Sequence, residues 1–208
     1  MKNLLVISSA TKKAYLGLKA GEDASFVEID ANCKQSENIL VEIDKLLSSK
    51  GLEINDIDAI GVVVGPGSFT GVRIGVSLVK GFCAVNKGIK VCPISSLDLI
   101  AEHINGVKNF ACGMNALSGL VFAKVFNGGK KESEKLVSLE EFNALKMPKF
   151  GLYEENICEN KIVLEPSKLL NLLEKEILQQ NFVEPNLLSP VYLRNSQAEE
   201  NLKKNLKN

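Results

Sequence analysis

The chain has 208 residues, of which 45% are hydrophobic and 24% are charged, so it can bury one sizeable core or two small ones. Its 25 basic and 25 acidic residues cancel. This argues against a protein that grips nucleic acid by itself, because such binding rests mainly on a basic surface. No apolar run reaches the roughly 18–20 residues of a membrane-spanning helix, and the apolar start is too short for a signal peptide. We expect a soluble cytoplasmic protein.

The cysteines and the histidine do not form a pattern typical of a catalytic or metal site. The five cysteines are widely spaced and form no CxxC pair, so we expect reduced thiols in apolar surroundings. His103 is the one histidine. A single histidine excludes metalloproteases with paired histidines and argues against a zinc site. No nucleophile motif lies near His103, so we predict neither a metal site nor a catalytic residue.

The first half of the chain alternates short strands with helices. Ser36 is expected to cap a helix whose apolar positions include Ile39 and Ile43, and Gly51 is expected to end it. A continuous apolar run then predicts a strand buried on both faces. The predicted elements are strands over 3–9, 14–19 and 24–29, a helix over 36–50 and a strand over 58–64.

The segment Gly-Pro-Gly-Ser-Phe-Thr-Gly-Val-Arg-Ile-Gly (65–75) follows this buried strand and opens a helix that runs to about Asn86. A glycine loop in this place can bind an anion through free backbone N–H groups and the helix dipole. However, no Lys-Ser or Lys-Thr pair completes a P-loop, and Gly71 comes one residue late for a dinucleotide loop. The alternative, which the spacing alone favours, is a tight turn that brings the helix close to the sheet.

The second half supports a coarser prediction. Pro93 and Ser95 break the pattern, so we expect a first lobe over 1–98 and a smaller second lobe over 99–208, with a weakly ordered tail over 196–208. Ser138 is expected to cap one helix, and Pro166 precedes another. The predicted elements are helices over 95–105, 138–145 and 167–180, and strands over 108–114, 119–126, 130–137, 149–153 and 161–164.

The segment GPGSFTGVRIGVSLVKG (65–81) resembles the signature of the TsaB (YeaZ) family, and residues 190–195 resemble that family's closing proline-x-tyrosine-leucine-arginine element. The resemblance implies an α/β fold with two lobes of the ribonuclease H-like (actin-like ATPase) type, mixed sheets and a degenerate nucleotide site. It draws attention to a glycine loop of Gly65, Pro66, Gly67, Ser68, Phe69, Thr70, Gly71 and Arg73, and to a C-terminal motif of Tyr192, Leu193 and Arg194.

The family resemblance also implies a function. It suggests a non-catalytic subunit for formation of threonylcarbamoyladenosine at tRNA adenosine 37, pairing with a catalytic TsaD-type subunit and a TsaE-type ATPase. ATP and magnesium would be used by these partners, this chain would bind no cofactor, and it would contact tRNA only indirectly. When alone it would form a homodimer.

Two features bear on this resemblance. The chain has only two arginines, Arg73 and Arg194, and each lies in one of the two motifs, which suggests that a planar guanidinium is needed there. Three positions depart from the family pattern: Ser8 and Asn115 replace aspartates, and Asn38 replaces a histidine. Loss of a metal-ordering carboxylate weakens the alternatives, an actin-like-fold small-molecule kinase or ATPase and, less well supported, a protease.

The helix after the glycine loop has two apolar stripes. On a helical wheel, Ile74, Leu78, Phe82 and Val85 share one face, which we predict packs against the sheet. The second stripe, with the first helix beside it, is predicted to be exposed and to dock a partner; the alternative is that the first helix covers it within the lobe. The predicted interface consists of Val72, Gly75, Val76, Val79, Lys80, Cys83, Ile39 and Ile43.

Overall fold

A computed structural model describes residues 1–30 and 35–194. The predictions for Cys33, for the side chain of Ser36 and for the tail over 196–208 lie outside the described residues.

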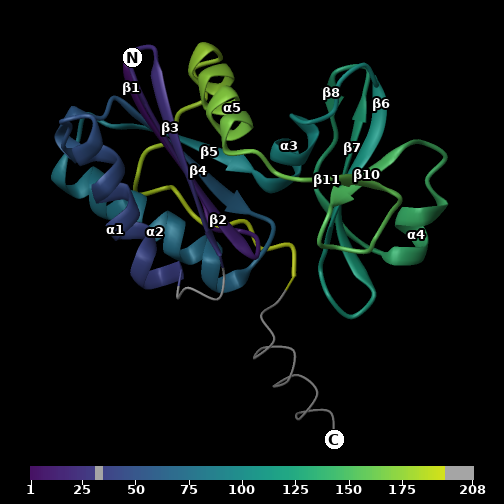
Figure 1. Cartoon of the computed structure of the whole chain (residues 1–208). Helices are drawn as coiled ribbons and strands as arrows, with labels where there is room; N and C mark the ends of the chain where they lie inside the picture. Colours follow the sequence, from purple (N-terminus) through teal and green to yellow (C-terminus); the bar gives the residue numbers. More distant parts are fainter. Residues whose placement is uncertain (31–34, 195–208) are drawn as a thin grey trace, which may run out of the picture.

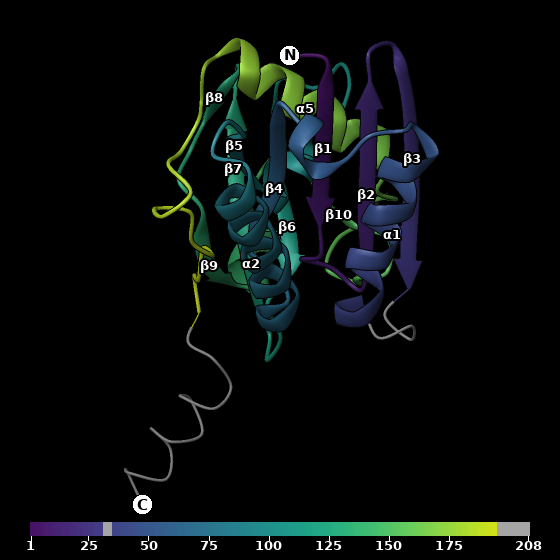
Figure 2. The ribbon, with the colours of Figure 1, turned by 90° about the vertical axis from the view of Figure 1, so that its left-hand side faces the viewer.

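The first lobe is a five-stranded mixed sheet with helices on both faces (Figure 1). Its strand order is β3-β2-β1-β4-β5; β1, β2 and β3 are antiparallel neighbours, whereas β4 and β5 run parallel to β1. Helices α1 and α2 lie side by side on one face, and α5 crosses the other (Figure 2). The elements are β1 (Asn3–Ser8), β2 (Lys13–Ala20), β3 (Asp23–Asp30), α1 (Gln35–Ser49), a short 3-10 helix (Ile54–Asp56), β4 (Ala59–Gly65), α2 (Phe69–Val85), β5 (Lys90–Ser95) and α5 (Pro166–Leu178).

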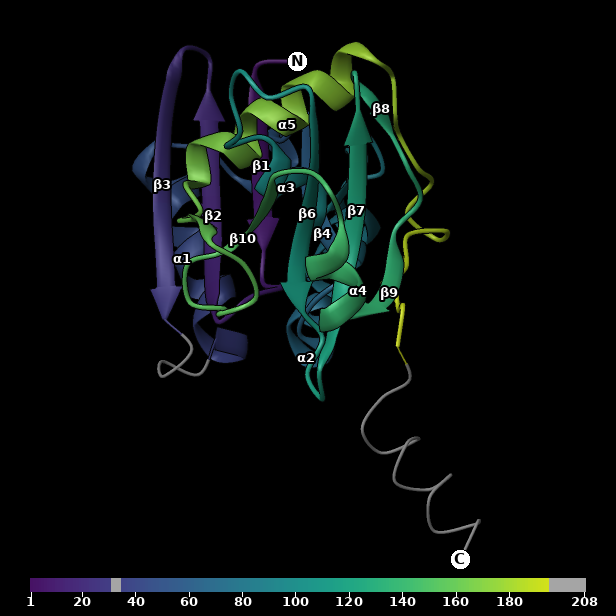
Figure 3. The ribbon, with the colours of Figure 1, turned by 90° about the vertical axis from the view of Figure 1, so that its right-hand side faces the viewer.

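The second lobe repeats this strand arrangement around β6. An antiparallel neighbour, β7, follows β6 and pairs with β8 and β9, while β10 and β11 run parallel to β6 on its other side. Two lobes with mixed sheets are the α/β architecture expected from the sequence; Figure 3 views the molecule from the side of the second lobe. The elements are α3 (Ser96–Ala101), β6 (Asn109–Asn115), β7 (Leu120–Asn127), β8 (Lys130–Lys131), β9 (Lys135–Ser138), α4 (Leu139–Ala144), β10 (Lys149–Leu152) and β11 (Asn160–Ile162).

Local sequence explains several of these elements. All seven residues of β4 are buried, as its continuous apolar run predicts for a strand covered on both faces. Ser138 caps α4, and the Glu141 carboxylate accepts a hydrogen bond from the Ser138 backbone N–H, which completes a capping box. Pro166 occupies the first turn of α5, where its missing N–H costs nothing.

The expected division of the chain is wrong in one respect. The first sheet ends at Ser95, close to the predicted boundary, but α5 packs against β1, β2 and β5 of the first sheet. Beyond α5, Val183 forms a bridge with Val91 of β5. The C-terminal part of the described chain therefore belongs to the first lobe, because the apolar stripe of α5 covers the sheet face that α1 and α2 leave open.

Buried charges attach α3 to the second lobe. The Lys124 amine on β7 is almost fully buried and lies 2.9 Å from Asp98 of α3 and 3.4 Å from Glu134. Lys131 approaches the same aspartate at 3.3 Å. Removing Lys124 would leave the mostly buried Glu134 carboxylate without its counter-charge, and the Lys124–Asp98 pair fixes α3 against β7.

The helix predicted over 95–105 ends already at Ala101, and His103 explains the change of direction. Its Nδ1 lies 2.8 Å from the Leu99 carbonyl and must donate the proton, while its Nε2 accepts the backbone N–H of Glu165 at 2.9 Å. The ring therefore joins the end of α3 to the start of α5 as a neutral imidazole. Burial lowers the pKa of His103 below its ordinary value of 6.5.

This arrangement makes stability depend on pH through His103. As the pH falls, the imidazole takes up a proton in the unfolded chain at a higher pH than in the folded protein. The contribution of His103 to the free energy of unfolding is therefore complete above pH 6.5 and is lost as the pH falls below that value. We expect the free energy of unfolding of the wild type, relative to His103→Gln, to decrease between pH 7.5 and pH 5.5 in denaturant titrations. An equal pH response of the two proteins would contradict this role.

Candidate functional site

The glycine loop is filled by the protein's own backbone. The N–H of Ser68 donates to the carbonyl of Ala10 at 2.7 Å, and the Ser68 hydroxyl accepts the N–H of Gly71 at 3.2 Å to cap α2. The hydroxyl of Ser9 donates to the Gly71 carbonyl at 2.7 Å. Two of the backbone donors that an anion would use, the N–H groups of Ser68 and Gly71, are therefore already engaged within the protein.

Close approach explains why two of the glycines are needed. A Cβ on Gly67 would lie 2.3 Å from the Ala10 carbonyl oxygen, and one on Gly71 would lie 1.8 Å from that of Ser9. No real side chain tolerates such distances. The geometry supports the tight-turn interpretation and argues against the anion-binding one.

The C-terminal motif packs onto this loop. The ring of Tyr192 stacks on that of Phe69 with centroids 4.2 Å apart, and the Tyr192 hydroxyl accepts a hydrogen bond from Nε of Arg73 at 2.7 Å. The Arg73 guanidinium also lies 4.9 Å from the Phe69 centroid. Val191 donates its N–H to the carbonyl of Val64 at the end of β4. The C-terminal motif therefore packs against the first lobe.

Arg194 extends the motif to the second lobe. Its guanidinium donates to the carbonyls of Ala116 and Leu117 and lies 3.4 Å from the Ser118 hydroxyl. Leu193 is half-buried and packs against the main core. Arg194 thus uses two of its guanidinium nitrogens, whereas Arg73 combines one hydrogen bond from Nε with contacts to two aromatic rings, and both suit a planar guanidinium.

The predicted exposure of the second α2 stripe is wrong. Val72, Val76, Val79 and Cys83 are between 0% and 6% exposed, and the glycines of the same face, Gly71 and Gly75, are also buried. Ile39 and Ile43 of α1 are likewise 0% and 1% exposed. The small Gly71 and Gly75 let α2 approach β1 closely, which turns this stripe to the sheet. Of the predicted interface residues, only Lys80 is exposed.

The stripe predicted to be core is the partly exposed one. Ile74, Leu78 and Phe82 are half-buried, and Val85 is 67% exposed. The flank of α2 that carries Phe69 and Arg73 contacts the C-terminal segment, so the opposite flank faces α1. On α1, Leu40 and Val41 are each 49% exposed. We call Leu40, Val41, Ile74, Leu78, Phe82 and Val85 the α1–α2 face; no described element lies over these helices (Figure 2).

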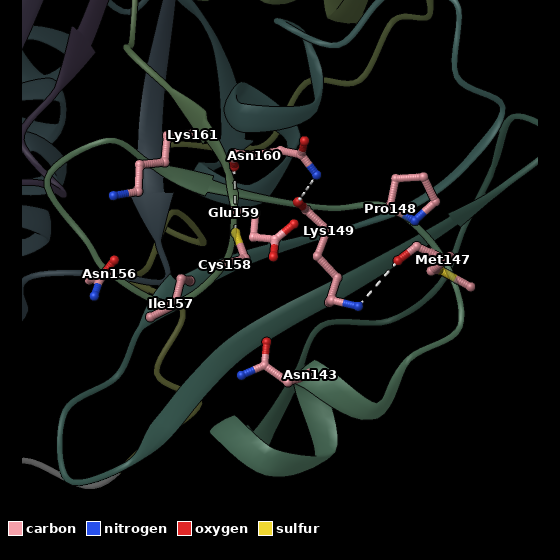
Figure 4. Close-up of a pocket in the computed structure, with 10 residues that line it drawn as sticks. All are labelled: Asn143, Met147, Pro148, Lys149, Asn156, Ile157, Cys158, Glu159, Asn160 and Lys161. Atoms are coloured by element: carbon pink, nitrogen blue, oxygen red, sulfur yellow. Dashed lines mark hydrogen bonds between the residues drawn. The ribbon is translucent and has the colours of Figure 1, made fainter.

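A hollow of about 840 Å³ lies in the second lobe (Figure 4). Its Lys149 amine is engaged with the carbonyls of Leu145 and Met147 at 2.9 and 3.4 Å. Burial raises the pKa of the Cys158 thiol, so this sulfur is a poor nucleophile. The hollow offers no activated nucleophile. Its lining consists of Asn143, Met147, Pro148, Lys149, Asn156, Ile157, Cys158, Glu159, Asn160 and Lys161.

Other reactive groups are also inert. Burial raises the pKa of Cys92 to about 12 and holds the pKa of Cys112 well above its ordinary value. The described ranges, 1–30 and 35–194, hold no group of three histidine, cysteine or carboxylate side chains placed to bind a metal. Nor does any helix in these ranges have both the length and the hydrophobicity required to cross a membrane.

Comparisons with known proteins show what the whole chain is similar to. The family model described as TsaD, tRNA N6-adenosine threonylcarbamoyltransferase, matches residues 29–123. The tRNA threonylcarbamoyladenosine biosynthesis protein TsaB of Haemophilus influenzae is 28% identical over 92% of this chain and 93% of its own length. Over most of its length, this chain is therefore similar to a TsaB protein. The TsaB protein of Bacillus subtilis is 33% identical over 41% of this chain and 39% of its length. The solved structure of YeaZ from Pseudomonas aeruginosa shares the fold, with a TM-score of 0.76 at 22% identity over 93% of this chain and all of that one.

The three departures from the TsaB pattern have different settings. Ser8 is buried at the end of β1, and its hydroxyl has no hydrogen-bond partner among the described residues. Asn38 is half-buried on α1. Asn115 ends β6, where its N–H donates to Glu155 at 2.6 Å and its Oδ1 accepts from Leu117 at 2.8 Å. Asn115 therefore shapes the hairpin that Arg194 contacts. Sequence reasoning missed Glu155, whose burial raises its pKa to about 7.

Proposed function

We propose that this chain is a non-catalytic subunit for the formation of threonylcarbamoyladenosine on tRNA, and that it acts by docking a TsaD-type catalytic subunit through the α1–α2 face. Similarity to a TsaB protein over 92% of the chain supports the pathway. The observation that carries the docking role is the exposure of the α1–α2 face. Three of its six apolar side chains are about half or more exposed. Apolar surface of this kind marks interaction sites.

The match to the TsaD family model supports the choice of partner. The matched residues, 29–123, include both α1 and α2. A TsaD-type chain with counterparts of these helices would pair with this chain about a pseudo-twofold axis. Two copies of this chain would pair in the same way about a true twofold axis. In such a pairing, α1 of each chain lies near α2 of the other.

Charge supports the same geometry. Helix α2 carries Arg73 and Lys80 exposed and no carboxylate. Helix α1 carries Glu42, which pairs with Lys45, and Asp44, which is exposed. In a pairing about a twofold axis, the basic α2 of one chain faces the acidic α1 of the other, so their charges are complementary. We expect a weak homodimer when the partner is absent.

The alternative of a small-molecule kinase or ATPase has less support. Its phosphate site would need free backbone donors and a metal-ordering carboxylate, whereas the N–H groups of Ser68 and Gly71 are engaged and Ser8 stands at the end of β1. We therefore assign ATP and magnesium to TsaD-type and TsaE-type partners, and we expect tRNA to reach the complex mainly through them. The described cysteines are free thiols, which fits a cytoplasmic protein.

Co-purification tests this proposal. A tagged copy of the chain, mixed with the TsaD-type subunit of the same organism, is expected to elute with it at equal stoichiometry in size-exclusion chromatography with light scattering. Leu78→Glu places a charge in the α1–α2 face and should weaken the complex at least about tenfold. Lys87→Glu, on the exposed turn after α2, is the matched charge control and should bind as the wild type. Equal elution of the two variants with the partner would contradict docking through this face.

A further inference from the structure

The last described residues connect parts of the molecule that are far apart in sequence. Val191 pairs with Val64 at the end of β4, Tyr192 lies on Phe69 and Arg73 of α2, and Arg194 reaches Ala116 and Leu117 in the second lobe. Within four residues, the chain therefore contacts the glycine loop of one lobe and the β6–β7 hairpin of the other.

We propose that residues 191–194 form a clasp that holds the glycine loop and the β6–β7 hairpin together and covers the end of β4. The carboxyl ends of parallel strands are where open α/β sheets bind small ligands. Here the carbonyl of Val191 lies against Gly65, at 2.8 Å from the position that a Cβ would take. The clasp takes the place of a ligand at this end of the sheet.

The hairpin is shaped to receive the arginine. Leu117 and Ser118 both have positive φ angles, of 64° and 54°, which are uncommon for residues other than glycine. In this conformation the carbonyls of Ala116 and Leu117 both accept hydrogen bonds from Arg194. A cationic donor makes such bonds stronger than neutral ones and repays the local backbone strain.

The first-lobe half of the clasp is built differently. The rings of Tyr192 and Phe69 are nearly parallel, 6° apart, and the Arg73 guanidinium lies beside both. Arg73 also holds the Tyr192 hydroxyl. Since Arg73 stands on α2, movement of the clasp is linked to the helix that carries part of the α1–α2 face. Through this coupling, the glycine loop and the β6–β7 hairpin open together in one local unfolding transition.

Hydrogen–deuterium exchange of the full chain tests the clasp. Two groups of amides report on it: Ser68 and Val72 in the first lobe, and Ala116 and Leu120 in the hairpin, all of which donate to backbone carbonyls. Arg194→Ala should raise exchange about tenfold in both groups at once, the size expected when hydrogen bonds from a charged donor are lost. The amides of β2 should be unchanged.

Tyr192→Phe is a second, gentler variant that removes only the hydroxyl and keeps the stacked ring, so the protein should fold. It should raise exchange in the same two groups by a smaller factor. Lys80→Ala, exposed on the same helix, is the control and should change neither. If Arg194→Ala speeds exchange in the hairpin alone, or Tyr192→Phe in the first lobe alone, the contacts are local and the clasp does not exist.

Discussion

Gly71→Ala is expected to destabilise the fold by more than about 3 kcal/mol, although alanine is normally favoured over glycine in a helix. The added Cβ would lie 1.8 Å from the carbonyl oxygen of Ser9, so either α2 or the turn after β1 must move. Moving α2 would also break the hydrogen bond from the Ser9 hydroxyl to the Gly71 carbonyl. Denaturant titration followed by circular dichroism measures the loss.

Gly81→Ala is the matched control on the same helix. A Cβ there meets no atom within 4 Å, so the substitution should stabilise the protein by about 0.5–1 kcal/mol. If the two variants have the same stability, the glycine loop is not the close contact that holds α2 on the sheet. A loss of stability in Gly81→Ala comparable to that in Gly71→Ala would also contradict this explanation.

Val76→Arg is expected to unfold the protein. Val76 is 4% exposed and packs in the main core, so an arginine there would place an unpaired charge among apolar side chains. The cost, more than about 4 kcal/mol, is a large share of the 5–15 kcal/mol that stabilises a typical domain. If the stripe were exposed and docked a partner, as predicted from the sequence, the variant would instead stay folded and lose association.

Val85→Arg makes the same change on the exposed stripe and separates the two explanations. Val85 is 67% exposed, so the free energy of unfolding should change by no more than about 0.5 kcal/mol. Association with itself and with a TsaD-type subunit should weaken. A folded Val76→Arg protein in a thermal melt would show that the buried stripe is not core.

The sequence predicted the strands and helices well where one physical signal dominates. The continuous apolar run of β4, the Ser138 cap and Pro166 each specify their element locally. The end of the helix predicted to reach residue 105 was missed because it depends on His103 contacting Glu165, 62 residues away. Similarly, the packing of α5 on the first sheet follows from which sheet face remains open, and no local pattern encodes this.

The orientation of α2 could not be read from apolar residues alone, because both stripes are apolar. The signal that decides it is the pair Gly71 and Gly75, which mark the face that approaches β1. The role of the two arginines was only half predictable. Their sequence motifs identified them, but their partners are a tyrosine hydroxyl and backbone carbonyls of a hairpin with positive φ angles.

The most direct test of the central claim is the yield of threonylcarbamoyladenosine on tRNA. The reaction is reconstituted from TsaD-type and TsaE-type subunits with ATP, magnesium and the threonylcarbamoyl donor. The product is measured by mass spectrometry of the digested nucleosides. The predicted result is that product forms only when this chain is added, saturates at equal stoichiometry with the TsaD-type subunit, and falls strongly with Val85→Arg. Product formation that does not depend on this chain, or formation by this chain alone, would contradict its assignment as a non-catalytic docking subunit.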